Sequence, residues 1–181
     1  MPVLSIWSPE DDVLGAVAPL ALAAAAGTAL VVDLDPNGPR YPGAGSLADL
    51  VIEGPRRDDL APRRRGVAAI RNGGVDPETA RDVLDALAAG WPAVVFRLPR
   101  DTKGRPGALP IVPLVPGGLL AGHPDSAVYQ RAGWRLDPPG NGPVLPRPRR
   151  QTLGMLLTGK VPPPGDRWIR AWRDVWRHPW L

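Results

Sequence analysis

Cysteine is absent from the 181 residues of this chain, so a disulfide framework, a thiol nucleophile and a cysteine metal site are all excluded. A long apolar run is also missing, because the alanine-rich stretch 16–26 is too short to span a bilayer and suits a buried helix better. The uncharged Met1-Pro2 start, followed by a short apolar segment, is not a signal peptide. We therefore expect a cytoplasmic protein, recruited at most to the inner face of the membrane.

Side chains suited to catalysis are scarce. The two histidines, His123 and His178, lie far apart and neither has the spacing of a metal ligand or of a catalytic triad. Asp33 and Asp35 form a pair of acids at a predicted strand end, but no base accompanies them. Ser46 is better explained as a helix N-cap than as a nucleophile. We expect no catalytic residue, no bound metal and no cofactor.

Proline (25) and glycine (21) are abundant, and they cluster between periodic segments as loop residues do. The periodic segments alternate between the two kinds of secondary structure. Strands are predicted over 3–7, 29–33, 66–70, 92–97 and 109–115, and helices over 13–26, 46–53 and 76–89. This alternation predicts right-handed crossovers and a mostly parallel sheet. Pro110 and Pro113 favour an edge position for the strand 109–115.

The rest of the chain divides into weaker elements. Short strands are predicted over 127–136 and 143–145, and helices over 149–158 and 166–178. A proline-rich spacer at 161–165 precedes the last helix. We expect an α/β domain over residues 1–160, with residues 161–181 packing on it or next to it.

The connection after the first predicted strand has the position of a phosphate-binding loop but not its chemistry. Such a loop needs glycines whose backbone N–H groups approach phosphate, a lysine, and a hydroxyl for Mg²⁺. Three carboxylates, Glu10, Asp11 and Asp12, stand there instead, and like charge disfavours a phosphate. The same residues also suit an acidic helix start, with Ser8 as N-cap and Pro9 at the first helical position. The two interpretations are compatible.

In this frame the chain resembles the ParA/MinD group of deviant Walker ATPases, SIMIBI-class P-loop proteins whose first strand runs into KGGxGKT. The first lysine of that motif falls on Glu10 and the glycine pair on Asp11 and Asp12. The phosphate-binding lysine falls on Gly15, and the magnesium-binding threonine on Ala16. The resemblance therefore implies a nucleotide-binding fold without the residues that bind nucleotide.

Two further segments carry the resemblance, which covers roughly residues 1–115. Residues 29–37 are similar to the hydrophobic-D-x-D-P-Q/N segment of the family, with Asp33 and Asp35 as its acids, although a strand leading into an Asx turn would also explain them. Residues 91–99 resemble the Walker B strand, with Arg97 in place of its acid. The implied fold is a shortened P-loop NTPase-like three-layer sandwich. We expect Arg97 to pair with Asp33 or a loop acid where Mg²⁺-nucleotide would lie.

The C-terminal helix combines tryptophan with arginine. Trp168, Trp172 and Trp176 recur every four residues, and arginines occupy the other faces at Arg167, Arg170, Arg173 and Arg177. Residues 131–181 contain ten Lys/Arg and three Asp/Glu, a charge of +7, so the remaining residues carry −3 of the total +4. We expect at least two of the tryptophans to be packed and the arginines to face outward.

Several functions suit such a helix. Its tryptophans can cover the core, it can dock a protein partner, or it can lie on a membrane surface, as the basic helix of MinD-like proteins does. Non-specific DNA contact, known for ParA-like ATPases, is a further alternative, although no specific nucleic-acid motif is present. The candidate partner-binding residues are the seven tryptophans and arginines named above.

The leading hypothesis is a non-catalytic ParA/MinD-like pseudo-ATPase. It would act as a protein-binding adaptor or positioning factor, alone or as a homodimer, in a bacterial assembly for partitioning, cell division, or secretion and pilus formation. The first alternative is a basic module that binds DNA or an anionic membrane surface. The second is an enzyme that binds nucleotide in a non-standard way.

Overall fold

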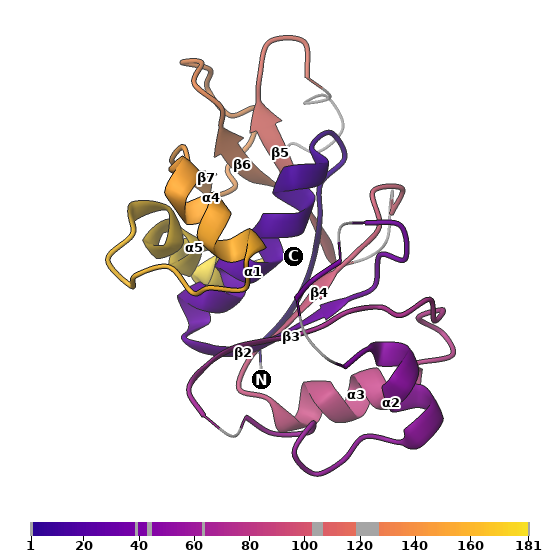
Figure 1. Ribbon diagram of the computed structural model, residues 1–181. Helices are drawn as coiled ribbons and strands as arrows, with labels where there is room; N and C mark the ends of the chain where they lie inside the picture. Colours follow the sequence, from indigo (N-terminus) through magenta and orange to yellow (C-terminus); the bar gives the residue numbers. More distant parts are fainter. Residues whose placement is uncertain are drawn as a thin grey trace.

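A single seven-stranded sheet forms the centre of the protein. The computed structural model describes residues 2–38, 40–42, 45–62, 64–102, 107–118 and 127–180. The strand order is β3-β2-β4-β1-β5-β6-β7 and every neighbouring pair is parallel (Figure 1). The strands are β1 (Val3–Trp7), β2 (Thr28–Asp33), β3 (Gly66–Ile70), β4 (Val94–Arg97), β5 (Ala108–Leu114), β6 (Val128–Arg131) and β7 (Val144–Leu145).

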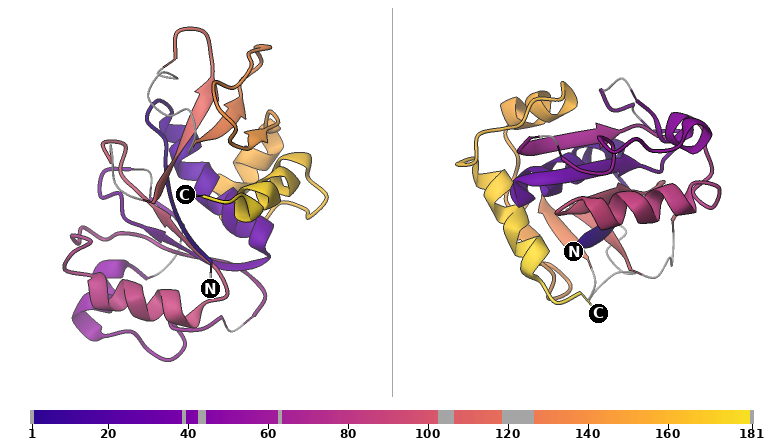
Figure 2. Two further views of the ribbon diagram at one scale, coloured as in Figure 1. Left: turned by 180° about the vertical axis from the view of Figure 1, so that it is seen from behind. Right: turned by 90° about the horizontal axis from the view of Figure 1, so that it is seen from below.

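Five helices lie on the two faces of this sheet. They are α1 (Asp12–Ala26), α2 (Leu47–Glu53), α3 (Arg81–Gly90), α4 (Arg150–Leu157) and α5 (Arg167–Arg177). α1, α4 and α5 cover one face, and α2 and α3 cover the other (Figure 2). The predicted three-layer α/β sandwich is therefore confirmed, and its sheet is wholly parallel.

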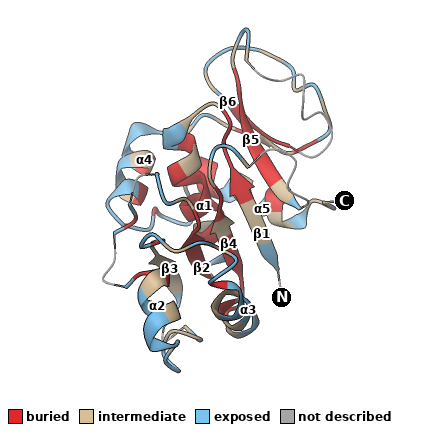
Figure 3. Cartoon of the chain, turned by 90° about the vertical axis from the view of Figure 1, so that its right-hand side faces the viewer, coloured by how far each residue is buried: buried red, intermediate tan, exposed pale blue. Residues whose placement is uncertain are grey.

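The central strands are buried on both sides, as crossover helices require. Alternate residues of β2 point to opposite faces: Val31 packs in the core under α1, whereas Leu30 and Val32 pack in the core under α3. Burial is densest around α1 and the strands beneath it (Figure 3). The helix α1 is itself buried along most of its length, which explains its alanine-rich sequence.

The C-terminal helix α5 belongs to the same core, because it packs across α1. Trp168 and Trp172 have exposed fractions of 1% and 0%, and the half-buried Trp176 donates its indole N–H to the carbonyl of Leu22 at 2.8 Å. Asp166 is the predicted N-cap and accepts hydrogen bonds from the first backbone N–H groups of the helix. The expected packing of at least two tryptophans is confirmed, and all four arginines of the helix are exposed.

The strand β5 is not at the sheet edge, contrary to the prediction from its prolines. It lies between β1 and β6, but the two neighbours pair with different halves of it. β1 pairs with residues 108–110, and β6 pairs with residues 111–114. Each half of β5 is thus hydrogen-bonded to a neighbouring strand on one side only. The absence of backbone N–H groups at Pro110 and Pro113 therefore removes few hydrogen bonds from the sheet.

Two predicted boundaries also differ. The helix α3 begins at Arg81 rather than at Asp76, because Asp76 closes a separate turn: its carboxylate accepts from the N–H of Glu78 and its carbonyl from that of Ala80. The strand β6 ends at Arg131 and does not continue to Leu136. Gly133 follows with a φ of 119°, a conformation that favours glycine and breaks the strand.

Candidate functional site

The candidate site lies at the carboxyl edge of the parallel sheet, where β1, β2 and β4 end side by side. Open α/β sheets place their ligands at this edge. In the register of the sheet, Asp33 of β2 stands beside Arg97 of β4, and Ile6 of β1 pairs with Arg97 from the other side. The connection from β1 to α1 crosses the same edge. The predicted loop residues and the predicted strand-end residues are thus brought together.

The connection from β1 to α1 contains only four residues, Ser8–Asp11, because α1 begins at Asp12. Asp11, not Ser8, is the N-cap: its carboxylate accepts a hydrogen bond from the N–H of Leu14 at 2.9 Å. Proline at position 9 is therefore outside the helix, which corrects the predicted cap. The carboxylate of Asp11 occupies a backbone N–H donor of the kind that binds phosphate at a helix start.

The loop is tied to the sheet by its other polar groups. The hydroxyl of Ser8 accepts from the N–H of Asp11 at 3.3 Å and donates to the carbonyl of Ile111 at 3.1 Å. On the opposite side, Arg100 donates to the carbonyl of Pro9 at 2.7 Å and lies 3.5 Å from the carboxylate of the exposed Asp12. The connection is therefore short and anchored to β5 and to the segment after β4.

The positions aligned with the phosphate lysine and the magnesium threonine lie inside α1. The N–H of Gly15 already bonds to the carbonyl of Asp11 at 2.8 Å, and Ala16 is fully buried. Gly15 itself is partly buried beside Ser8. The third loop acid, Glu10, lies near Gly118, because a Cβ atom placed on that glycine would stand 3.1 Å from a carboxylate oxygen of Glu10.

Arg97 forms a buried ion-pair cluster with the two acids at the end of β2. One terminal nitrogen lies 3.3 Å from the carboxylate of Asp33, and the other lies 2.8 Å from that of Asp35. The side chains of Arg97 and Asp33 are each 3% exposed. The expected pairing of Arg97 is therefore confirmed, and a guanidinium group stands between two carboxylates at the carboxyl edge of the sheet.

Backbone donors hold the two acids in place. Asp33 accepts from the N–H of Asp35 at 3.0 Å, and Asp35 accepts from that of Asn37 at 3.0 Å, which makes two successive Asx turns. Burial raises the pKa of Asp33 to about 6, although Arg97 and the backbone N–H oppose that shift. The effect of burial on the pKa of Asp33 is therefore larger than the opposing effect of its ion pair.

Two residues of the cluster have no signal in the sequence. Tyr41 is buried, lies with its ring 5.4 Å from the guanidinium of Arg97, and donates its hydroxyl to the carbonyl of Ala16 at 2.9 Å. Burial raises the pKa of Tyr41, so it stays neutral. Gly38 lies against the cluster, and any Cβ there would overlap the guanidinium of Arg97. The role of a tyrosine within a Gly/Pro-rich loop becomes recognisable only once the loop is folded.

A polar hollow of about 400 Å³ adjoins the cluster at the ends of β2 and β3. It is lined by Asp33, Asp35, Pro36, Gly38, Arg40, Ser46, Asp49, Arg71, Asn72, Gly73 and Gly74. The acids that line it are engaged elsewhere: Arg97 pairs with two of them, and Asp49 forms a capping box with Ser46, whose hydrogen bonds lower the pKa of Asp49. Within the described ranges, no group of three or more His, Asp or Glu residues could hold a metal ion.

The C-terminal candidates separate into two groups. Trp168 and Trp172 lie in the core, so they are not available to a partner, and this corrects their place among the docking residues. Arg167, Arg170 and Arg173 are exposed and stay candidates. Arg177 is also exposed and stays a candidate, whereas Trp176 is half-buried.

Of the two histidines, His178 lies in the described part of the chain, at the end of the last helix. His178 caps the C-terminus of α5 and its ring lies 4.5 Å from that of Trp180. His123 falls outside the residues that the structure describes.

Sequence reasoning missed the contact that attaches α5 to the sheet. Gln130 on β6 is buried, accepts from the indole N–H of Trp168 at 2.7 Å, and donates to the carbonyl of Pro146 at 2.9 Å. A polar residue in a predicted strand gave the only hint of this role. The contact joins β6, the segment after β7, and α5.

These features define an α/β fold with a wholly parallel sheet, and its arrangement of strands and helices is similar to that of MinD. The chain is similar to one in the MinC:MinD cell division protein complex of Aquifex aeolicus, with 12% identity, a TM-score of 0.58, and coverage of 99% of this chain and 97% of that one. It is also similar to the MinD cell division protein of Aquifex aeolicus, with 12% identity, a TM-score of 0.56 and full coverage of both chains.

At this identity the likeness concerns the fold. It extends past residue 116, where the sequence motifs end. No protein-family model and no curated protein matches the sequence. No helix among the described residues is long and apolar enough to cross a membrane.

Proposed function

We propose that this chain is a MinD-like pseudo-ATPase that acts by binding a protein partner without using nucleotide. The observation that carries the proposal is the Arg97 cluster, in which a protein cation takes both acids at the carboxyl edge of the sheet. In a P-loop protein Mg²⁺ and nucleotide supply the positive and negative charges of this region. Here the chain supplies the charges itself.

The β1–α1 connection supports the same proposal. A working phosphate loop presents free backbone N–H groups and a lysine. In this chain Asp11 caps the helix start, and the aligned lysine position is Gly15 within the helix. A phosphate entering here would meet carboxylates rather than donors, and the repulsion would be largest where the site is least hydrated.

One of the similar structures is a complex of MinD with MinC, and we extend protein association to the present chain, as an adaptor or positioning factor in a bacterial assembly. The exposed arginines of α5 are the residues most suited to such contact, because arginine is enriched at binding hot spots. The competing proposal is nucleotide binding in a rearranged mode, for which the polar hollow beside the Arg97 cluster is the candidate cavity.

Thermal unfolding with and without Mg-ATP or Mg-GTP tests the proposal. A nucleotide at about 100 times its Kd would add about 2.7 kcal/mol of stability and raise the Tm measurably. We expect no shift for either nucleotide, and no heat of binding in calorimetry. Micromolar binding of Mg-ATP would overturn the pseudo-ATPase proposal.

The second half of the proposal, partner binding, needs its own measurement. We expect native complexes purified on the tagged chain to retain the same partner in EDTA and in Mg-ATP, because the chain makes its own charge pairs. Retention that depends on Mg-ATP would contradict nucleotide independence. A chain that purifies alone under both conditions would contradict the adaptor role.

A further inference from the structure

A shallow basic hollow of about 430 Å³ lies between β7 and α5, far along the sheet from the Arg97 cluster. Its lining residues are Arg131, Val144, Pro146, Arg167, Arg170, Ala171 and Asp174. The three guanidinium groups and one carboxylate give it a formal charge of +2. All four charged side chains are exposed, and no ion pair joins Arg167 or Arg170 to a described carboxylate.

The arginines of the hollow lie near the start of α5. Arg167 is the first residue of the helix and Arg170 follows one turn later, and the acid at this end is the N-cap Asp166, whose carboxylate accepts from the N–H groups of Trp168 and Ile169. The positive end of the helix dipole favours anions there and disfavours cations. Because Asp166 already caps this end, an anionic ligand in the hollow would interact mainly with the guanidinium groups of Arg167 and Arg170.

The wall formed by β7 suits an extended polypeptide. β7 is the last strand of the sheet, and the N–H of Tyr129 on β6 bonds to the carbonyl of Pro143. In a parallel ladder the backbone groups of successive residues alternate in direction, so those of Val144 point away from β6. Pro146 and Ala171 provide small apolar surface between the arginines. An extended chain can hydrogen-bond to such an edge.

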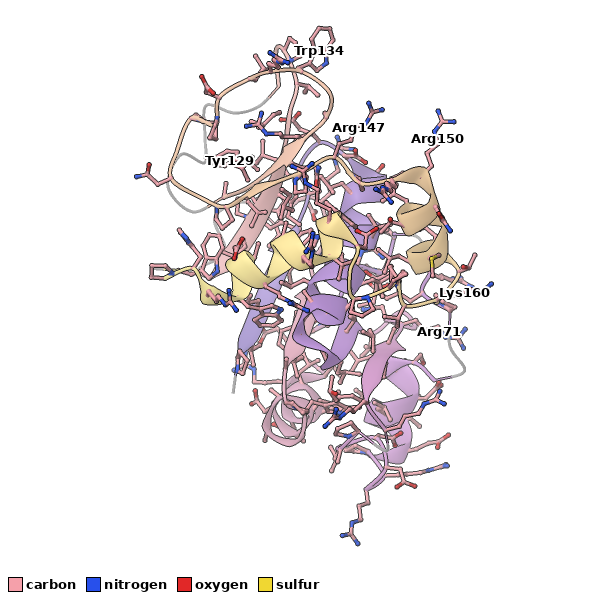
Figure 4. The ribbon with its side chains drawn as sticks, turned by 90° about the vertical axis from the view of Figure 1, so that its left-hand side faces the viewer. Arg71, Tyr129, Trp134, Arg147, Arg150 and Lys160 are labelled. Atoms are coloured by element: carbon pink, nitrogen blue, oxygen red, sulfur yellow. The ribbon has the colours of Figure 1, made fainter. Side chains whose placement is uncertain are left out.

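We propose that this hollow binds an acidic, extended segment of the partner protein, with carboxylates on Arg167, Arg170 and Arg131. The guanidinium fork matches a carboxylate in two parallel hydrogen bonds. This inference rests on the proposed partner-binding function and names the chemistry of the partner. Further arginines face outward on the same side of the molecule, among them Arg147 and Arg150, and they extend the positive field that would steer such a segment (Figure 4).

Asp174 favours a polypeptide over nucleic acid. A nucleic acid presents a continuous line of phosphates, one about every 3.4 Å along each strand. Such a line would place a phosphate near the exposed carboxylate of Asp174, whose own pairing with Arg177 is long at 3.9 Å. A polypeptide can alternate acidic and neutral side chains and so avoid this repulsion.

Fluorescence anisotropy on the full chain tests the proposal with three probes. The probes are a labelled peptide of alternating Glu and Val, a labelled single-stranded oligonucleotide of the same formal charge, and vesicles containing phosphatidylserine. We expect the peptide to bind at least about tenfold more tightly than the oligonucleotide, a difference of about 1.4 kcal/mol. Equal or tighter binding of the oligonucleotide or the vesicles, or no binding of the peptide, would overturn it.

The variants locate the binding on the surface. Arg167→Glu with Arg170→Glu should weaken peptide binding at least about tenfold, whereas Arg173→Glu, on the same helix but outside the hollow, should change it less than about threefold. The double variant places acids at the helix start, where they stabilise, so a lower Tm is not expected. Equal effects of the two substitutions would contradict the assignment. Nucleotide binding is measured separately, so its outcome does not decide this one.

Discussion

The Arg97 cluster and the basic hollow contain arginine in two opposite states. In the cluster the guanidinium is 3% exposed and lies within 3.3 Å of two carboxylates. In the hollow Arg167 and Arg170 are exposed and have no carboxylate partner among the described residues. The first arrangement fixes the structure of the chain, because a buried charge must be paired. The second leaves charge available to a partner.

The two regions therefore place arginine in two different roles. Arg97 stabilises the fold through buried ion pairs, whereas Arg167 and Arg170 are exposed to solvent. In this chain Arg97 pairs with both acids at the carboxyl edge of the sheet, and the exposed arginines of the basic hollow lie at the far end of the sheet, on β6 and α5. Substitutions at the two places should therefore affect different properties, stability at the first and association at the second.

Deletion of residues 166–181 should have the largest effect, loss of the folded state. It removes four buried side chains, Trp168, Ile169, Trp172 and Val175. At about 1.5–3 kcal/mol each, they contribute about 6–12 kcal/mol, which is comparable to the whole stability of a typical domain. Circular dichroism and chemical unfolding measure the result.

The control replaces only the outer face of the helix. Changing Arg167, Arg170, Arg173 and Arg177 to glutamine should leave the free energy of unfolding within about 1 kcal/mol of the wild type, because exposed charges contribute little. A deletion variant that unfolds with the stability of the full chain would show that α5 is dispensable for the core.

The sequence predicted the fold better than it predicted the site. The strands 3–7 and 66–70 were placed with the bounds that the structure has, because apolar runs bounded by Gly or Pro are local signals. The pairing of Arg97 with Asp33 also followed from sequence, since both end parallel strands. The interior position of β5 did not follow from the sequence, because prolines favour an edge strand. An interior position is compatible with the prolines only because β1 and β6 pair with different halves of β5.

The members of the cluster that come from loops were not predictable. The loop after β2 brings Tyr41 and Gly38 next to Arg97. The path of such a loop cannot be predicted from hydrophobic periodicity, because the loop has none. The N-cap at Asp11 was missed because Ser8 and Pro9 form a stronger local pattern, whereas the hydroxyl of Ser8 is used to hold β5. The contact between Ser8 and β5, which is distant in the sequence, therefore explains why Asp11 and not Ser8 caps the helix.

Arg97→Met should have the second largest effect, a loss of about 3–5 kcal/mol of stability at neutral pH. The substitution keeps most of the side-chain volume but leaves Asp33 and Asp35 without their cation. The matched control is Arg170→Met, an exposed residue, for which we expect a change within about 0.5 kcal/mol. Urea unfolding of both variants measures the difference. Equal losses of stability in the two variants would mean that the buried ion pairs of Arg97 contribute no more than an exposed arginine does. The proposed difference between the Arg97 cluster and the basic hollow would then be wrong.

The smallest effect concerns the pH dependence of the cluster. The pKa of Asp33 is about 6 in the folded chain and 3.8 ordinarily, so the folded state holds a proton that the unfolded state has lost between these values. Stability from this group is therefore full below about pH 4 and falls as the pH rises through 6, by at most about 3 kcal/mol. Asp33→Asn removes the titration and keeps the carbonyl oxygen that accepts from the N–H of Asp35.

We expect the stability of the wild type, relative to Asp33→Asn, to decrease between pH 4 and pH 7. Measuring the difference between the two proteins cancels the titration of the other groups, which the substitution leaves in place. Asp174→Asn is the matched control in the basic hollow, and its exposed carboxylate should give a difference that changes little over the same range. A wild type that gains stability relative to Asp33→Asn with rising pH would mean that Arg97 outweighs burial at Asp33. The buried charges would then be fully compensated, and the cluster would not sense protons.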